Sequence, residues 1–89
     1  MDRSIFEAGL KADGFTEIDT KRYETRPANG EHGHHFTVRG LIIDGAFIVT
    51  LDGQERTFRP GDVFEVVAGA MHCEAVGPDG VELLVGRKY

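Results

Sequence analysis

The hydrophobic pattern of the chain changes near residue 14. Before that point, apolar residues recur at the spacing of one helix face, and Gly14 follows as a stop signal. We expect a helix over residues 4–13, with Ser4 as its N-cap and Glu7 three residues further on to complete a capping box. From Phe15 onward, short apolar runs alternate with turn signals, which is typical of an all-β sandwich or barrel.

Turn-forming residues divide this second part into segments. Asp44-Gly45 and Asp52-Gly53 each lie between β-rich runs, and an Asp-Gly pair supplies the positive φ values that a tight hairpin needs. Further turns are expected at residues 59–62, 68–70 and 77–80. We therefore expect roughly seven strands. The run at residues 47–51 is apolar on both alternating faces, which indicates cover on each side, as where two sheets pack together.

Composition and charge limit the class of protein and its partners. The 89 residues are 40% hydrophobic and 28% charged, as in a single globular domain, with the helix in residues 1–14 and the barrel in residues 15–89. The formal charge of −5 and the scattered basic residues argue against a nucleic-acid or membrane partner. A single cysteine, Cys73, and the lack of a signal-peptide pattern predict a cytoplasmic protein.

The histidines carry the candidate chemistry. His32 and His34 are two residues apart, and side chains at that spacing share one face of a strand, whereas His35 points the other way. His72 lies in another predicted strand and is the histidine left to complete a three-imidazole metal site. The alternative is that no metal binds, with His32 and His34 in water and His72 hydrogen-bonded inside the barrel.

The spacing around these histidines resembles the two motifs of the cupin superfamily. The first motif has His-X-His, three or four residues, Glu, six residues and Gly, and it maps onto residues 32–45. The second has Gly, five residues, Pro-X-Gly, two residues, His, three residues and Asn, and it maps onto residues 61–76. The resemblance to small bacterial cupins implies a cupin-type double-stranded β-helix, a jelly-roll-like barrel, with one short N-terminal helix.

The chain departs from the cupin pattern at four positions. Val67 and Val76 replace the Pro and the Asn of the second motif, and Arg26 stands where the first motif often begins with Gly. Val38 occupies the position of the glutamate that is the family's usual fourth ligand, and valine cannot coordinate a metal. The resemblance therefore implies a three-histidine site with positions open to water or substrate, as in the three-histidine iron dioxygenases of the superfamily. Imidazole ligands alone do not distinguish Fe, Zn, Ni and Mn.

Four other residues are candidates for the site. Glu74 follows His72 by two residues and so shares its strand face, which makes it a candidate fourth ligand or, alternatively, a surface residue. Arg39 is a candidate anchor for a substrate carboxylate, against the alternative of a solvated strand arginine. Phe36 and Val38 are candidates for the pocket wall.

Several functions remain open on this basis. One is a metal-dependent enzyme, a dioxygenase or a Lewis-acid catalyst, acting on a small oxygenated metabolite, although no residue is identified as a general base. The alternative is a non-catalytic module that binds or senses a small molecule, and a third is a structural dimer unit without ligand. The resemblance also implies a homodimer, because small cupins commonly pair through edge strands.

Overall fold

The computed structural model describes residues 1–89 and contains one helix and five antiparallel strands. The elements are α1 (Arg3–Ala12), β1 (Thr16–Tyr23), β2 (Thr37–Leu51), β3 (Gln54–Phe58), β4 (Val63–Val66) and β5 (His72–Lys88). The predicted all-β class with one N-terminal helix is confirmed. With 10 residues, α1 is too short to span a membrane.

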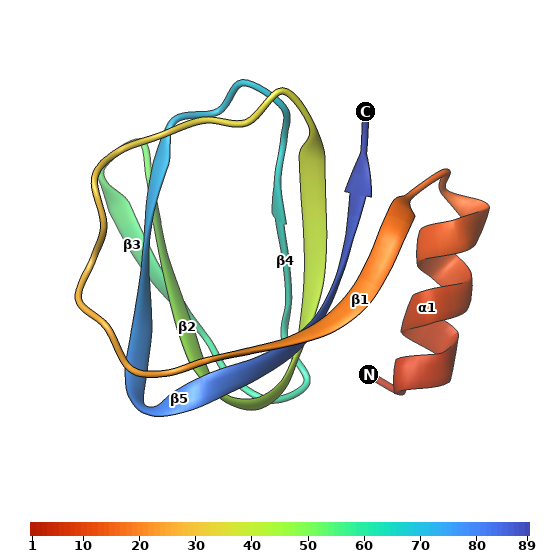
Figure 1. Cartoon of the computed structure of the whole chain (residues 1–89), viewed down its shortest axis with the longest axis horizontal. Helices are drawn as coiled ribbons and strands as arrows, with labels where there is room; N and C mark the ends of the chain where they lie inside the picture. Colours follow the sequence, from red (N-terminus) through yellow and green to blue (C-terminus); the bar gives the residue numbers. More distant parts are fainter.

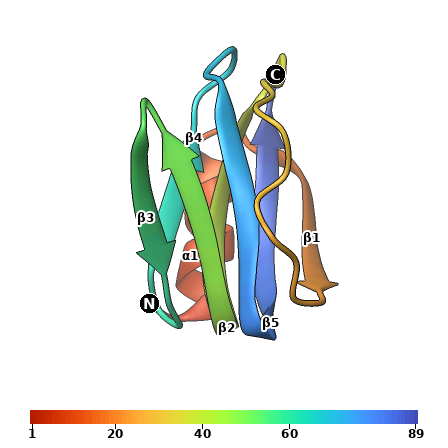
Figure 2. The same ribbon diagram turned by 90° about the vertical axis from the view of Figure 1, so that its left-hand side faces the viewer.

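The sheet is built around the two long strands, β2 and β5. They pair with each other from Thr37↔Lys88 to Leu51↔His72. On its other side, the first half of β2 pairs with β4 and the second half with β3, while β1 pairs with the second half of β5. Figures 1 and 2 show that the halves of each long strand lie in opposite walls of a barrel, with α1 outside the wall that contains β1.

Bends in the long strands replace two of the predicted turns. Asp44-Gly45 lies inside β2, between register shifts at Ile42/Asp44 and Gly45/Phe47, and residues 77–80 lie inside β5. The hairpin predicted at residues 44–45 and the turn predicted at residues 77–80 are therefore wrong, and five strands form instead of seven. The same turn-forming residues make bulges, which increase the twist and carry each strand from one wall to the other.

The remaining turn predictions are confirmed. Asp52 and Gly53 form a two-residue hairpin between β2 and β3, with φ values of 52° and 76° that match a tight turn of this kind. Residues 59–62 turn the chain between β3 and β4, and residues 68–70 separate β4 from β5.

The N-cap of the helix lies two residues before the predicted one. Asp2, not Ser4, is the N-cap, because its carboxylate accepts hydrogen bonds from the backbone N–H groups of Ser4 at 2.7 Å and Ile5 at 3.2 Å. The stop at Gly14 is confirmed, since this glycine follows the last turn with a φ of +85°.

Two clusters of buried side chains hold the barrel together. One fills the interior between the walls and includes Phe47, Phe64 and Val81. The other lies between α1 and the outer face of the wall that contains β1, where Leu10 packs with Leu41. The helix thus covers the outer face of the barrel at Leu41. Ile48 points outward from the run at residues 47–51 and is only half-buried, so the cover predicted for this face is incomplete.

A substitution at Gly45 tests how far the bend in β2 depends on glycine. A Cβ at Gly45, whose φ is +81°, would lie 2.0 Å from the carbonyl oxygen of Gly80. We expect Gly45→Ala to lower the free energy of unfolding by at least about 3 kcal/mol, because a strained φ and a backbone overlap add together. Gly53→Ala is the control: its φ of +76° is similar but its Cβ would meet nothing within 4 Å, so it should cost about 1 kcal/mol. Urea unfolding followed by circular dichroism measures both, and equal losses would contradict this account.

Candidate functional site

The three histidines of the predicted set converge, although two of them lie outside any strand. His32 and His34 belong to the segment between β1 and β2, where His32 forms an isolated bridge with His72 at the start of β5. The strand that we predicted for His32 and His34 is therefore wrong. The three ring centroids nevertheless lie 4.5 to 5.4 Å apart, and one ligand atom from each ring lies within 4.8 Å of the others.

Backbone hydrogen bonds fix the segment that carries His32 and His34. The N–H of His32 donates to the carbonyl of His72 at 2.9 Å, and the reverse bond is 2.8 Å long. Asn29 donates its N–H to the carbonyl of Glu74 at 3.1 Å, and its side-chain oxygen accepts from the N–H of Glu74 at 2.9 Å. The N–H of Gly69 donates to the carbonyl of His34 at 2.7 Å. The segment thus acts as an additional, irregular strand beside β5.

Hydrogen bonds also orient two of the imidazoles. The Nδ1 atom of His32 lies 2.9 Å from the carbonyl oxygen of Gly30, and Nδ1 of His72 lies 3.0 Å from that of Ala70. Because a carbonyl oxygen can only accept, each Nδ1 carries a proton and each Nε2 is left for the cluster. His72 is fully buried, and its Nε2 has no hydrogen-bond partner. Leaving such an atom unsatisfied costs about 1–3 kcal/mol.

The carboxylate of Glu74 lies beside these nitrogen atoms. One of its oxygens is 3.5 Å from Nε2 of His32 and the other is 3.7 Å from Nε2 of His72. With both rings neutral, two nitrogen lone pairs and a negative carboxylate converge at this point, and a cation among them would relieve their repulsion. The donor set therefore fits a cation, and imidazole nitrogen with carboxylate oxygen is a set that transition metals accept.

His34 completes the set in its neutral form. Burial lowers the pKa of the His34 imidazole, and the nearby His32 and His72 rings lower it further. A lowered pKa leaves this imidazole uncharged at pH 7, which is the form that binds a metal. The ring also stacks on Phe36, with centroids 4.7 Å apart and planes 10° from parallel, so its position is fixed by packing.

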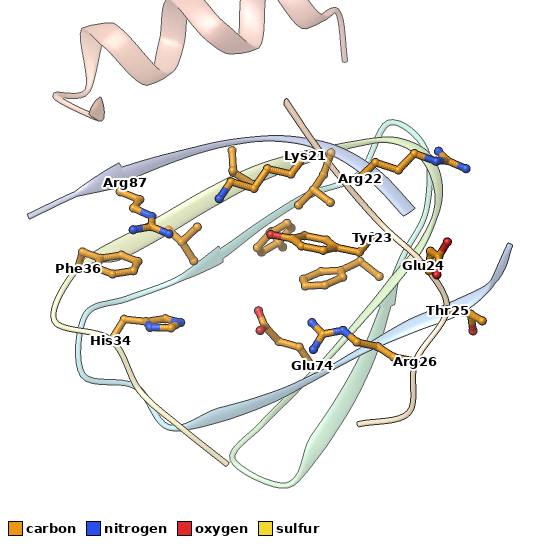
Figure 3. A pocket seen from close by; sticks show the side chains of 15 residues that line it. Lys21, Arg22, Tyr23, Glu24, Thr25, Arg26, His34, Phe36, Glu74 and Arg87 are labelled. Atoms are coloured by element: carbon orange, nitrogen blue, oxygen red, sulfur yellow. The ribbon is translucent and has the colours of Figure 1, made fainter. Parts of the chain in front are cut away.

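A cavity of about 610 Å³ adjoins the histidines inside the barrel. Figure 3 shows His34 and Glu74 reaching into it, with Phe36 at the end near His34. Val38, at the position of the glutamate in the cupin motif that the sequence resembles, contributes to its apolar wall. The carboxylate beside the histidines is that of Glu74, which comes from β5, whereas Val38 on β2 has none.

Arg39 lies away from this cavity. Its guanidinium donates to the carboxylates of Asp13 and Glu65, each at 2.6 Å, and lies 4.4 Å from the ring centroid of Phe15. The hydrogen bond to Asp13, followed by that to Glu65, raises the pKa of Arg39. Arg39 therefore joins the end of α1 to β4, and the structure does not bring it to the site together with the other candidates.

Sequence reasoning missed the cationic residues of the cavity. Lys21, Arg26 and Arg87 are among its lining residues, as is Tyr23. The signal that could have found them is the alternation of side chains between the two faces of a strand. Lys21 and Tyr23 are two residues apart on β1, and residues 83, 85 and 87 of β5 all line the cavity. That signal can be used only when the inward face of each strand is known.

No protein-family model matches the chain, and no curated protein matches it significantly. Solved structures resemble it. A cupin superfamily protein of Desulfitobacterium hafniense superposes with a TM-score of 0.68 at 24% identity, covering 80% of this chain and 64% of its own length. An RmlC-like cupin of Shewanella frigidimarina gives 0.67 at 21% identity, with coverage of 80% and 63%. KdgF of a Halomonas species gives 0.60 at 22% identity, with coverage of 84% and 86%.

These likenesses establish the fold. The chain has the all-β cupin fold, and inside it lies a three-histidine group that could hold a metal. The resemblance expected from the two motifs is confirmed at this level. The chain spans less than two thirds of the length of the Desulfitobacterium and RmlC-like proteins.

The contacts of Arg39 predict a structural role for it. We expect Arg39→Ala to lower the free energy of unfolding by about 1–2 kcal/mol, because two ion pairs and a cation–π contact are lost. Ligand binding in the cavity should not change. Arg56→Ala is the control, since Arg56 lies 5.0 Å from the ring centroid of Phe58 and has no ion pair, so it should cost about 0.5 kcal/mol. Thermal and urea unfolding measure the change. Unaltered stability together with lost ligand binding would restore Arg39 as a substrate anchor.

Proposed function

We propose that this protein is a metal-dependent cupin that binds a small oxygenated molecule. His32, His34 and His72 hold a divalent transition metal, and the adjoining cavity takes the small molecule. The observation that carries the proposal is the buried Nε2 atom of His72. It has no hydrogen-bond partner, and it lies among two further imidazoles and the Glu74 carboxylate.

The donor set leaves the metal open among Fe, Zn, Ni and Mn. A divalent ion bound there would polarise an oxygen atom of the small molecule as a Lewis acid or, as iron, support reaction with dioxygen. The chain's own contributions are the neutral imidazole of His34, the two Nδ1–H groups that orient His32 and His72, and the carboxylate of Glu74. We propose Glu74 as a fourth ligand, in place of the glutamate missing at Val38.

Two classes of activity are consistent with this site. As an enzyme, the protein would be a dioxygenase or a Lewis-acid catalyst, and Glu74 is the carboxylate that both lines the cavity and adjoins the histidines. As a binding or sensing module, it would hold the small molecule without changing it. Steady oxygen uptake by the iron-loaded protein in the presence of an oxidisable organic substrate, such as a thiol, a diketone or a phenol, supports a dioxygenase. Recovery of a bound molecule unchanged identifies a binding module.

Metal binding should stabilise the folded state. At a free metal concentration of about one hundred times Kd, we expect a gain of about 2.7 kcal/mol, which raises Tm by about 10 °C or more for a chain of this size. Differential scanning fluorimetry with Fe, Zn, Ni and Mn measures the shift on protein without a histidine tag. Elemental analysis should find close to one metal per chain.

Matched histidine variants assign the shift to the site. His34→Gln and His72→Gln should abolish it, whereas His35→Gln should retain it, because His35 is exposed and lies outside the group. If His72→Gln does not fold, His34→Gln alone decides, since its ring is less buried. Absence of any shift with all four metals, or a shift that survives both variants, would contradict the proposal.

Glu74 has a separate test. We expect Glu74→Gln to weaken zinc affinity by at least about tenfold, because the carboxylate charge beside two Nε2 atoms is lost. Glu82→Gln removes the same charge from the same strand outside the site and should have little effect. Competition with a chromophoric chelator measures the affinities, and equal affinities for the two variants would exclude Glu74 as a ligand.

A further inference from the structure

We propose that the molecule bound in the cavity is an organic anion, a small carboxylic acid with an apolar body, and that Arg26 holds its carboxylate. The inference rests on the proposed function only in that the cavity takes a small molecule, and it does not require the metal. Four features of the cavity support it: its charge, the absence of an ion pair at Arg26, the weak ion pair of Arg87 and the apolar wall.

The charge of the cavity is opposite to that of the chain. The formal net charge is −5, yet four cationic side chains line the cavity against two carboxylates. Figure 3 shows Arg22 pointing away and Glu24 at the rim, which leaves Lys21, Arg26 and Arg87 around the cavity with Glu74. Glu74 already lies against two imidazoles. Cationic groups gathered in a partly enclosed site raise the local concentration of anions.

Arg26 lacks the partners that a guanidinium in this setting needs. Its Nε atom is buried without a hydrogen-bond acceptor, and the side chain forms no ion pair. Its one close aromatic neighbour is Tyr23, at 5.8 Å from the ring centroid. Arg39 shows the opposite case, because two carboxylates at 2.6 Å neutralise it. A guanidinium left unpaired beside a cavity is suited to a carboxylate ligand, which it can bind through two parallel hydrogen bonds.

Arg87 adds to the positive potential at the end of the cavity near His34. Its guanidinium lies 4.4 Å from the ring centroid of Phe36, and its one ion pair, with Glu17, is 4.0 Å long. Such a distant, exposed pair neutralises little of the charge. The contact with Phe36 engages the face of the guanidinium, and its one ion pair is the long one with Glu17, so an acceptor can still bind to it.

The remaining wall indicates that the anion is organic. Phe36, Phe47, Phe64, Leu83 and Val85 supply apolar surface to the same cavity. A free inorganic anion would leave this surface without a partner, whereas an acid with a hydrocarbon or aromatic body would cover it. The combination of apolar wall and unpaired guanidinium thus selects a carboxylic acid over inorganic phosphate.

Neutral isosteres provide the test. Benzoate, phenylacetate and hexanoate are each compared with their own amide, and inorganic phosphate is the further probe. Chemical-shift titrations of 15N-labelled protein give the affinities, once for metal-free and once for zinc-saturated protein. We expect at least one acid to bind about tenfold or more tightly than its amide, and phosphate to bind more weakly than that acid.

Arginine variants assign the preference to a residue. Arg26→Gln should reduce the ratio of acid to amide affinity to near one while the amide binds as before. Arg22→Gln removes the same charge from a side chain that points away, and it should leave the ratio within twofold. The thermal stability of each variant confirms folding.

The outcomes separate this inference from the proposed function. Equal binding of acids and amides, binding of none of them, phosphate binding as tightly as the acids, or a preference that survives Arg26→Gln would each overturn it. If metals give no thermal shift but the acid preference depends on Arg26, the anion site stands and the metal proposal falls. If metals bind but no acid is preferred over its amide, the metal proposal stands and the anion site falls.

Discussion

The pairing of β2 with β5 is the constraint on which the rest of the structure depends. Each strand contributes one half to each wall, so the two walls are joined by continuous backbone instead of by loops. The two strands can stay paired across both walls only because their bends lie opposite each other, at Gly45 of β2 and Gly80 of β5. Gly45 and Gly80 approach so closely there that a Cβ on Gly45 would meet the carbonyl of Gly80. This bend in the paired strands sets the size of the interior, the distance between the walls and the face of each strand that points inward.

The sequence predicted the fold class and the histidine set better than the strands themselves. His34 and His72 were identified by residue counts within two motifs, and such counts remain correct even when the strands are assigned wrongly. The Asp-Gly pair at residue 44 was misread because a turn dipeptide and a bulge require the same positive φ, and only tertiary pairing decides between them. The contacts of Arg39 could not be predicted for a related reason, since its partner Asp13 is distant in sequence and its face of β2 was unknown.

The site shows how the topology brings side chains from different strands to one cavity. Val38 and Glu74 lie on different strands, yet both line one cavity, so a carboxylate can reach the imidazoles from β5. The same cavity adjoins a histidine group that could hold a metal and contains Arg26, whose guanidinium has no ion pair. The chain therefore offers a place for a cation and a place for an anion, although its own net charge is −5. A bound metal and an organic acid would occupy them together, each reducing the electrostatic cost of the other.

The segment between β1 and β2 has a kinetic consequence. Arg26, Asn29 and His32 all lie on it, and all three are tied to the backbone of β5 by hydrogen bonds. This segment is therefore a wall of the cavity, the source of two of the three imidazoles and the carrier of the unpaired guanidinium. A molecule too large for the rim can leave only if the segment detaches from β5, and that movement would also withdraw His32 and His34. The residence time of such a molecule and that of the ion would then be governed by one opening event.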